Sequence, residues 1–237
     1  IPVYTTEGGW LHHPPVQLVD ETLAARAQGF AGAKLKVGKP TGAEDLKRLA
    51  AVRDAVGPEF QLMVDANQRF TAAEALRRAH LWAGLDLGWF EEPLPADDVD
   101  GHARLQAGTP IPVAVGESLY SPGQFADYLK RNACGIVQVD VARVGGITPW
   151  LKVAHMAECC NVAVAPHFLM ELHLALACAV PNSAWLEYIP QLDLVAPSPV
   201  RVADGHVLPA TAPGLGIEWD WPSVEKLTVP GSKTTLG

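Results

Sequence analysis

Short β-rich runs alternate with amphipathic helical stretches along nearly the whole chain, and this alternation constrains the possible folds most. The eight β-rich runs cover Ile1–Thr6, Ala33–Val37, Gln61–Ala66, Leu87–Glu91, Val113–Glu117, Ile136–Val141, Val162–His167 and Trp185–Ile189. The seven helical stretches between them cover roughly residues 19–29, 43–56, 71–84, 97–107, 121–132, 146–160 and 169–179. Strands that alternate with helices predict βαβ units and a parallel sheet.

The number of these units predicts an α/β fold, a TIM-type (β/α)7β barrel over residues 1–190. A chain of 237 residues is long enough for one such domain. A doubly wound open sheet is the alternative, but no glycine-rich phosphate-binding turn follows the first strand. Residues 191–237 are rich in proline and glycine with little periodicity, and we expect this C-terminal segment to pack on the barrel.

The composition excludes several classes of protein. The net charge is -8 and no basic run stands out, so nucleic acid is not an expected partner. No stretch of about 18 consecutive apolar residues predicts a membrane span. The four cysteines lack CxxC spacing, which predicts reduced thiols and favours a cytoplasmic location. The chain begins at Ile1, inside the first predicted strand, which suggests a cut or incomplete N-terminus.

Polar side chains stand at the carboxyl ends of seven successive predicted strands, where the side chains of a barrel converge on one mouth. Asp65, Glu91 and Glu117 end three neighbouring strands, which lie about 4.8 Å apart, so their carboxylates can meet and repel one another. A divalent cation removes this repulsion, and oxygen-only ligands suit Mg²⁺. Three separate surface acids are the alternative, and their equivalent positions argue against it.

Lys34 and Lys36 share one side of the second strand, because side chains alternate along a strand. Leu35 and Val37 take the other side, which suits the helix-covered face, so we expect both lysines to face the barrel interior. Two neighbouring lysines are expected to lower each other's pKa, and a neutral amine can act as a base. A lysine pair at the surface edge is the alternative.

Asp140 and His167 end the sixth and seventh strands, and we expect them to pair, since a carboxylate fixes the tautomer of an imidazole and supports its proton transfer. Glu187, which ends the eighth strand, could hydrogen-bond a substrate or an oxyanion if protonated; a rim carboxylate is the alternative. Glu171 and His173, in the last helical stretch, are expected to be structural or to support the site. The candidate substrate-binding residues are Asn67, Lys34, Arg143, Ser118 and Glu187. For Arg143, a salt bridge at the rim is an equal alternative.

These residues lie in segments that resemble the enolase superfamily, specifically its mandelate racemase subgroup. The similar segments are K-L-K (Lys34–Lys36), V-D-A-N-Q (Val64–Gln68), W-F-E-E-P-L (Trp89–Leu94), G-E (Gly116–Glu117), V-D-V-A-R-V-G-G-I (Val139–Ile147), A-P-H-F (Ala165–Phe168) and W-L-E (Trp185–Glu187). They occur in order over nearly the whole chain. Locally, R-V-G-G-I and Ala165–Leu174 are most similar to acid-sugar dehydratases of the talarate/galactarate type.

The resemblance implies a magnesium enzyme with one Mg²⁺ per active site, held by Asp65, Glu91 and Glu117. Its reaction would remove the proton α to a substrate carboxylate through an enediolate. The expected outcome is dehydration of an acid sugar to a 2-keto-3-deoxy acid. Racemisation or epimerisation of a 2-hydroxy acid by the same residues is one alternative, and a non-catalytic magnesium-binding barrel is another.

The resemblance also implies roles in proton transfer. Lys36 would be the base on one face of the substrate, with Lys34 tuning it and touching the carboxylate. His167, paired with Asp140, would be the acid or base on the opposite face. Glu187 would hydrogen-bond the substrate carboxylate as it becomes an enediolate.

Members of the family carry a capping domain before the barrel, which the segment 191–237 would also contact. This domain is absent from the sequence, so we expect a fragment whose barrel mouth is open to water and whose activity is poor. The expected partners are a small-molecule carboxylate substrate and other copies of the chain.

Overall fold

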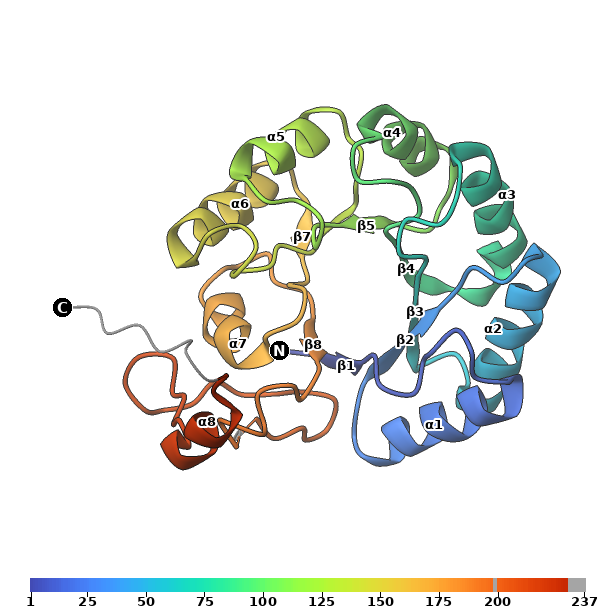
Figure 1. Ribbon diagram of the computed structural model, residues 1–237. Helices are drawn as coiled ribbons and strands as arrows, with labels where there is room; N and C mark the ends of the chain where they lie inside the picture. Colours follow the sequence, from blue (N-terminus) through green and yellow to red (C-terminus); the bar gives the residue numbers. More distant parts are fainter. Residues whose placement is uncertain (198–199, 230–237) are drawn as a thin grey trace.

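Eight parallel strands form one sheet that curls into a barrel with helices around its outside (Figure 1). This computed structural model describes residues 1–197 and 200–229. The strand order is β7-β6-β5-β4-β3-β2-β1-β8. The ends of this order meet at Val164, whose backbone N–H donates to the carbonyl of Asn182 at 2.9 Å and whose carbonyl accepts from Ala184 at 2.8 Å. The predicted (β/α)7β barrel is therefore confirmed, and the doubly wound alternative is excluded.

The strands are β1 (Val3–Thr5), β2 (Gly32–Lys36), β3 (Gln61–Asp65), β4 (Leu87–Glu91), β5 (Val113–Val115), β6 (Ile136–Val137), β7 (Ala163–Val164) and β8 (Leu186–Tyr188). The helices are α1 (Pro15–Ala27), α2 (Gly42–Val56), α3 (Ala72–Trp82), α4 (Val99–Gly108), α5 (Pro122–Lys130), α6 (Ile147–Cys159), α7 (Met170–Cys178) and α8 (Trp221–Leu227), with a short 3-10 turn (Ala83–Leu85) after α3. Each predicted strand and helix thus has its counterpart.

Two elements differ from the sequence prediction. Helix α1 begins at Pro15 rather than near residue 19. Proline suits the first helical position, because the backbone N–H that it lacks would have no partner within the helix there. The C-terminal segment holds α8, although its sequence shows little periodicity. This short helix begins after Asp220, whose side chain accepts from the backbone N–H of Ser223 at 3.3 Å.

Two apolar layers hold the barrel and place the polar residues. Leu35 and Val37 lie in the outer layer, between the strands and the helices, as the alternation along β2 predicts. Tyr4, Met63 and Trp89 fill the interior, where the rings of Tyr4 and Trp89 meet edge to face at 5.1 Å. Side chains two residues further along each strand share the interior face. The interior layer therefore forms an apolar floor beneath the strand-end charges.

The segment after β8 returns along the outside of the barrel beside β1 and α7 (Figure 1). His206 forms an isolated antiparallel bridge with Pro2, and the N–H of Val207 donates to the carbonyl of Ile1 at 2.9 Å.

Among the described helices, none is long and apolar enough to cross a membrane. All four cysteines are free.

Candidate active site

Three carboxylates meet at the carboxyl ends of β3, β4 and β5. Asp65 and Glu91 are direct partners in the register of β3 and β4, and Glu117 follows β5. One oxygen from each of these residues lies within 4.8 Å of the other two. Asp65 and Glu91 are fully buried, whereas the side chain of Glu117 is 17% exposed, so the cluster opens toward the barrel mouth. Three convergent oxygen donors with one open side fit Mg²⁺, which retains positions for water or substrate.

Gly116 allows Glu117 to reach this cluster. A Cβ atom at this position would lie 2.3 Å from the carbonyl oxygen of Gln138, which follows β6. Only glycine permits such a close approach between the two chain segments.

Glu91 is the most constrained of the three carboxylates. Its Oε2 accepts from Trp89 Nε1 at 3.0 Å and from Gln138 Nε2 at 2.6 Å. Burial raises the pKa of Glu91; Lys34 opposes this rise and the negative charge of Asp65 adds to it. A cation at the cluster would offset this repulsion.

Lys34 is buried between two carboxylates. Its Nζ lies 2.6 Å from Glu91 Oε1 and 2.7 Å from Glu187 Oε1. Burial alone would lower the pKa of Lys34, but Glu187 and Glu91 raise it well above its ordinary value. The expectation that this lysine has a lowered pKa is therefore wrong, because sequence alone does not show which charges surround a side chain.

Lys36 is the more accessible lysine, with 17% of its side chain exposed against 2% for Lys34. Its Nζ contacts Oδ2 of Asp65 and lies 2.9 Å from Oδ1 of Asn67. Both lysines face the interior side of β2, as predicted, but only Lys36 reaches the open mouth. The guanidinium of Arg48 donates to the carbonyl of Lys36 at 2.9 Å and fixes the backbone there.

His167 lies on the far side of the carboxylate cluster from Lys36. Its Nδ1 lies 2.9 Å from Oδ2 of Asp140, and its Nε2 lies 3.3 Å from Oε2 of Glu117. Burial would lower the pKa of His167, but the hydrogen bond with Asp140 and the charges of Glu187 and Glu117 raise it. The structure thus forms the predicted pair and favours the protonated imidazole.

Glu187 reaches into the barrel from β8. Its Oε1 accepts from Thr6 Oγ1 at 2.6 Å, and its Oε2 accepts from the backbone N–H of Phe168 at 2.8 Å. Burial would raise the pKa of Glu187, but the adjacent Lys34 lowers it. These contacts favour the ionised carboxylate. A protonated Glu187 was the form considered from the sequence, and the charge of Lys34 does not support it.

The remaining substrate-binding candidates surround the mouth. Arg143 donates to the carbonyl oxygen of Glu117 at 2.6 Å and lies 3.5 Å from Oε1 of the same residue, so it borders the cluster. Ser118 Oγ accepts from Gln68 Nε2 at 2.7 Å. Gln68 also lies 3.3 Å from both carboxylate oxygens of the buried Glu92. Gln68 ends the V-D-A-N-Q segment, but it was not among the site residues expected from the sequence. Its position shortly after Asp65 and directly after Asn67 was the one feature that could have indicated it.

His173 supports the site, one of the two roles expected for it from the sequence. Its Nδ1 donates to the carbonyl of Phe168 at 2.6 Å, and its Nε2 accepts from the backbone N–H of Val141 at 2.9 Å. Those two residues directly follow His167 and Asp140. The buried ring therefore joins the two chain segments that carry the pair, and its two hydrogen bonds require the neutral form.

Comparison with known proteins agrees with this geometry. The family model for enolase C-terminal domain-like proteins matches residues 17–224. The chain belongs to this family. Within the enolase family, L-talarate/galactarate dehydratase of Salmonella typhimurium is 43% identical over 213 residues, which cover 90% of this chain and 54% of that enzyme.

Two solved structures show the same likeness in three dimensions. L-talarate dehydratase from Polaromonas sp. JS666, complexed with Mg and L-glucarate, superposes with a TM-score of 0.92 at 40% identity, over 95% of this chain and 63% of that one. A racemase from Streptomyces coelicolor A3(2) with bound magnesium also gives a TM-score of 0.92, at 33% identity, over 97% of this chain and 63% of that one. The chain thus spans between half and two thirds of the length of these enolase-family relatives. The likeness places it in the mandelate racemase subgroup.

Proposed function

We propose that this barrel catalyses the magnesium-dependent removal of a proton α to a carboxylate, and that the outcome is dehydration of an acid sugar to a 2-keto-3-deoxy acid. One observation carries the proposal. Lys36 contacts Asp65 at one end of the carboxylate cluster, and His167 contacts Glu117 at the other end. Two proton-transfer groups therefore flank one candidate metal site.

Asp65, Glu91 and Glu117 are the proposed magnesium ligands. Bound Mg²⁺ would supply positive charge that stabilises the negative charge developing on the substrate carboxylate. Lys34 would add a second positive charge from inside the barrel, where its neighbouring carboxylates keep it protonated. Glu187 would hold Lys34 in place and accept hydrogen bonds as an ionised group.

Lys36 is the proposed base and His167 the proposed acid. Lys36 reaches the mouth, and loss of its proton would let it accept the α-proton. Asp140 holds Nδ1 of His167, which leaves Nε2 directed at the cluster. A protonated Nε2 would donate its proton to the departing 3-hydroxyl group. Asn67, Ser118 and Arg143 remain proposed substrate contacts.

An acid sugar is the proposed substrate class because two relatives with 40% or more identity are an L-talarate/galactarate dehydratase and an L-talarate dehydratase complexed with Mg and L-glucarate. Racemisation is a second candidate, since two groups on opposite sides of the cluster could also exchange a proton across one carbon. The likeness to the Streptomyces coelicolor racemase supports it. Self-association, the cytoplasmic location and the division of the chain at residue 190 stay predictions.

Proton NMR in D₂O tests the proposal, with Mg²⁺ and a panel of sugar acids. Loss of the α-proton signal with a new deoxy-methylene signal supports the dehydratase, and exchange without that product supports the racemase. Lys36→Ala and His167→Asn variants serve as controls. Full turnover in both variants would contradict the assignment. The product of the gene's complete reading frame is assayed in parallel, because the relatives are longer than this chain.

A further inference from the structure

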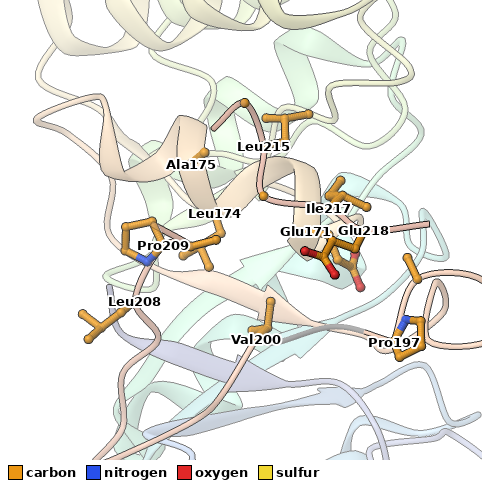
Figure 2. Close-up of a pocket in the computed structure, with 14 residues that line it drawn as sticks. Glu171, Leu174, Ala175, Pro197, Val200, Leu208, Pro209, Leu215, Ile217 and Glu218 are labelled. Carbon is orange, nitrogen blue, oxygen red and sulfur yellow. The ribbon is translucent and has the colours of Figure 1, made fainter. Parts of the chain in front are cut away.

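A second site lies on the outside of the barrel, between α7 and the segment after β8 (Figure 2). There a cavity of about 120 Å³ is lined from α7 by Glu171, Leu174 and Ala175. Leu215 and Ile217 line it from the C-terminal segment. One water molecule needs only about 10–15 Å³ of such space, so the cavity has room for a larger group.

Glu171 is a buried carboxylate without a partner. Its side chain lines the cavity and the residue is 5% exposed. Neither of its carboxylate oxygens has a hydrogen-bond partner among the described residues. Buried polar groups in native proteins are almost always paired, and a buried carboxylate without a partner is strongly unfavourable. Its place in the first turn of α7 compensates for only part of this cost.

The surroundings of Glu171 add negative rather than positive charge. Glu218 lines the same cavity, and Figure 2 shows the two side chains together. None of the described residues that line it is basic. Burial raises the pKa of Glu171; its own backbone N–H opposes this rise, and the nearby carboxylate of Asp193 adds to it. The described lining residues therefore supply no cation to these acidic groups.

We propose that this cavity binds a small organic cation, an alkylammonium or alkylguanidinium ion. Its charged head pairs with Glu171 and Glu218, and its alkyl chain lies against the apolar wall. Leu174, Leu215 and Ile217 are among the residues of that wall. A metal ion fits this site less well, because its lining does not bring three metal-ligating side chains together. Among the described residues, only the active-site cluster does so.

Titration of the ¹⁵N-labelled chain with n-butylguanidinium tests the proposal, followed by backbone amide shifts in NMR. We expect saturable shifts that cluster at residues 171–175 and 214–218. The uncharged n-butylurea has nearly the same shape and is expected to produce none. Equal binding of both compounds, or no saturable binding of the cation, would overturn the proposal.

Three variants locate the binding. Glu171→Gln removes the charge with little change of shape and is expected to weaken binding about tenfold or more. Ala175→Leu is expected to block binding by filling the cavity, and it decides the question if the first variant does not fold. Glu59→Gln makes the same change on the exposed loop between α2 and β3 and is expected to bind normally. Unchanged affinity in folded Glu171→Gln and Ala175→Leu would place the cation elsewhere. None of these readouts depends on catalysis, so the result stands apart from the proposed activity.

Discussion

The imidazole of His167 and the carboxylate of Asp140 lie 2.9 Å apart, joined through Nδ1 and Oδ2. Asp140 is itself held by the backbone N–H groups of Ala142 and Arg143, at 2.8 and 3.1 Å. These backbone contacts hold the carboxylate of Asp140 in place, and the carboxylate in turn orients the ring of His167. This arrangement leaves one nitrogen of His167 for chemistry at the carboxylate cluster.

Replacing Asp140 with Asn should lower activity without removing the metal site. The amide can still contact the ring but no longer stabilises its positive charge, so proton transfer should slow by about 100-fold or more. Product formation measured by NMR checks this prediction. Calorimetric titration with Mg²⁺ is the control and should be unchanged. Normal turnover in Asp140→Asn would show that the pair is structural.

Replacing Glu117 with Gln should weaken magnesium binding while the fold survives. Glu117 is the most exposed of the three candidate ligands, so its change disturbs the buried core least. Loss even of groups that support a metal ligand costs about 10–100-fold in affinity, and loss of a ligand should cost at least that much. The rise in melting temperature on adding Mg²⁺ measures the effect. Glu21→Gln, on the exposed face of α1, should keep the full rise.

His173 should make the chain less stable as the pH falls from about 6.5 to 4. Burial lowers the pKa of His173 to about 4, although the hydrogen bond to the carbonyl of Phe168 and the charge of Asp140 oppose this shift. The unfolded chain binds a proton near pH 6.5, whereas the folded chain does not bind it until the pH is near 4. Stability is therefore fully present above the unfolded pKa and falls by up to about 3 kcal/mol across this window.

Urea unfolding at pH 7 and pH 5 measures the contribution of His173. His173→Gln can still offer a donor and an acceptor but does not titrate, so its stability should fall less between these pH values. His155→Gln, an exposed position on α6, should keep the parent dependence. An identical loss in the His173 variant would assign the pH dependence to other groups.

Asp45→Asn should destabilise the chain by about 3 kcal/mol, because removing one partner of a buried ion pair leaves the other uncompensated. Asp45 is fully buried, and its carboxylate lies 2.5 Å from Arg78 and 3.4 Å from Arg48. It also accepts from the backbone N–H of Gly38 at 2.8 Å, just beyond Lys36. Chemical denaturation measures the loss. Asp54→Asn, on the exposed face of the same helix, should have little effect, and equal stabilities would contradict the prediction.

Local sequence patterns were enough to predict the barrel and the position of most candidate site residues. Alternation along β2 separates Lys34 and Lys36 from Leu35 and Val37, and strand ends place Asp65 beside Glu91. A parallel barrel brings every strand end to one mouth, so position in the chain already predicts proximity in space.

The charge states and the supporting contacts, by contrast, follow from how remote segments pack in the folded chain. Lys34 keeps its proton because carboxylates from β4 and β8 enclose it, and those strands lie far from β2 in sequence. His173 joins the segments after β6 and β7 from helix α7, and the sequence does not show which segments it would contact. The sequence does not show that Glu171 is buried beside a cavity that the segment after β8 also lines. Electrostatic and hydrogen-bond contacts of this kind depend on distances between remote segments, which a local pattern does not contain.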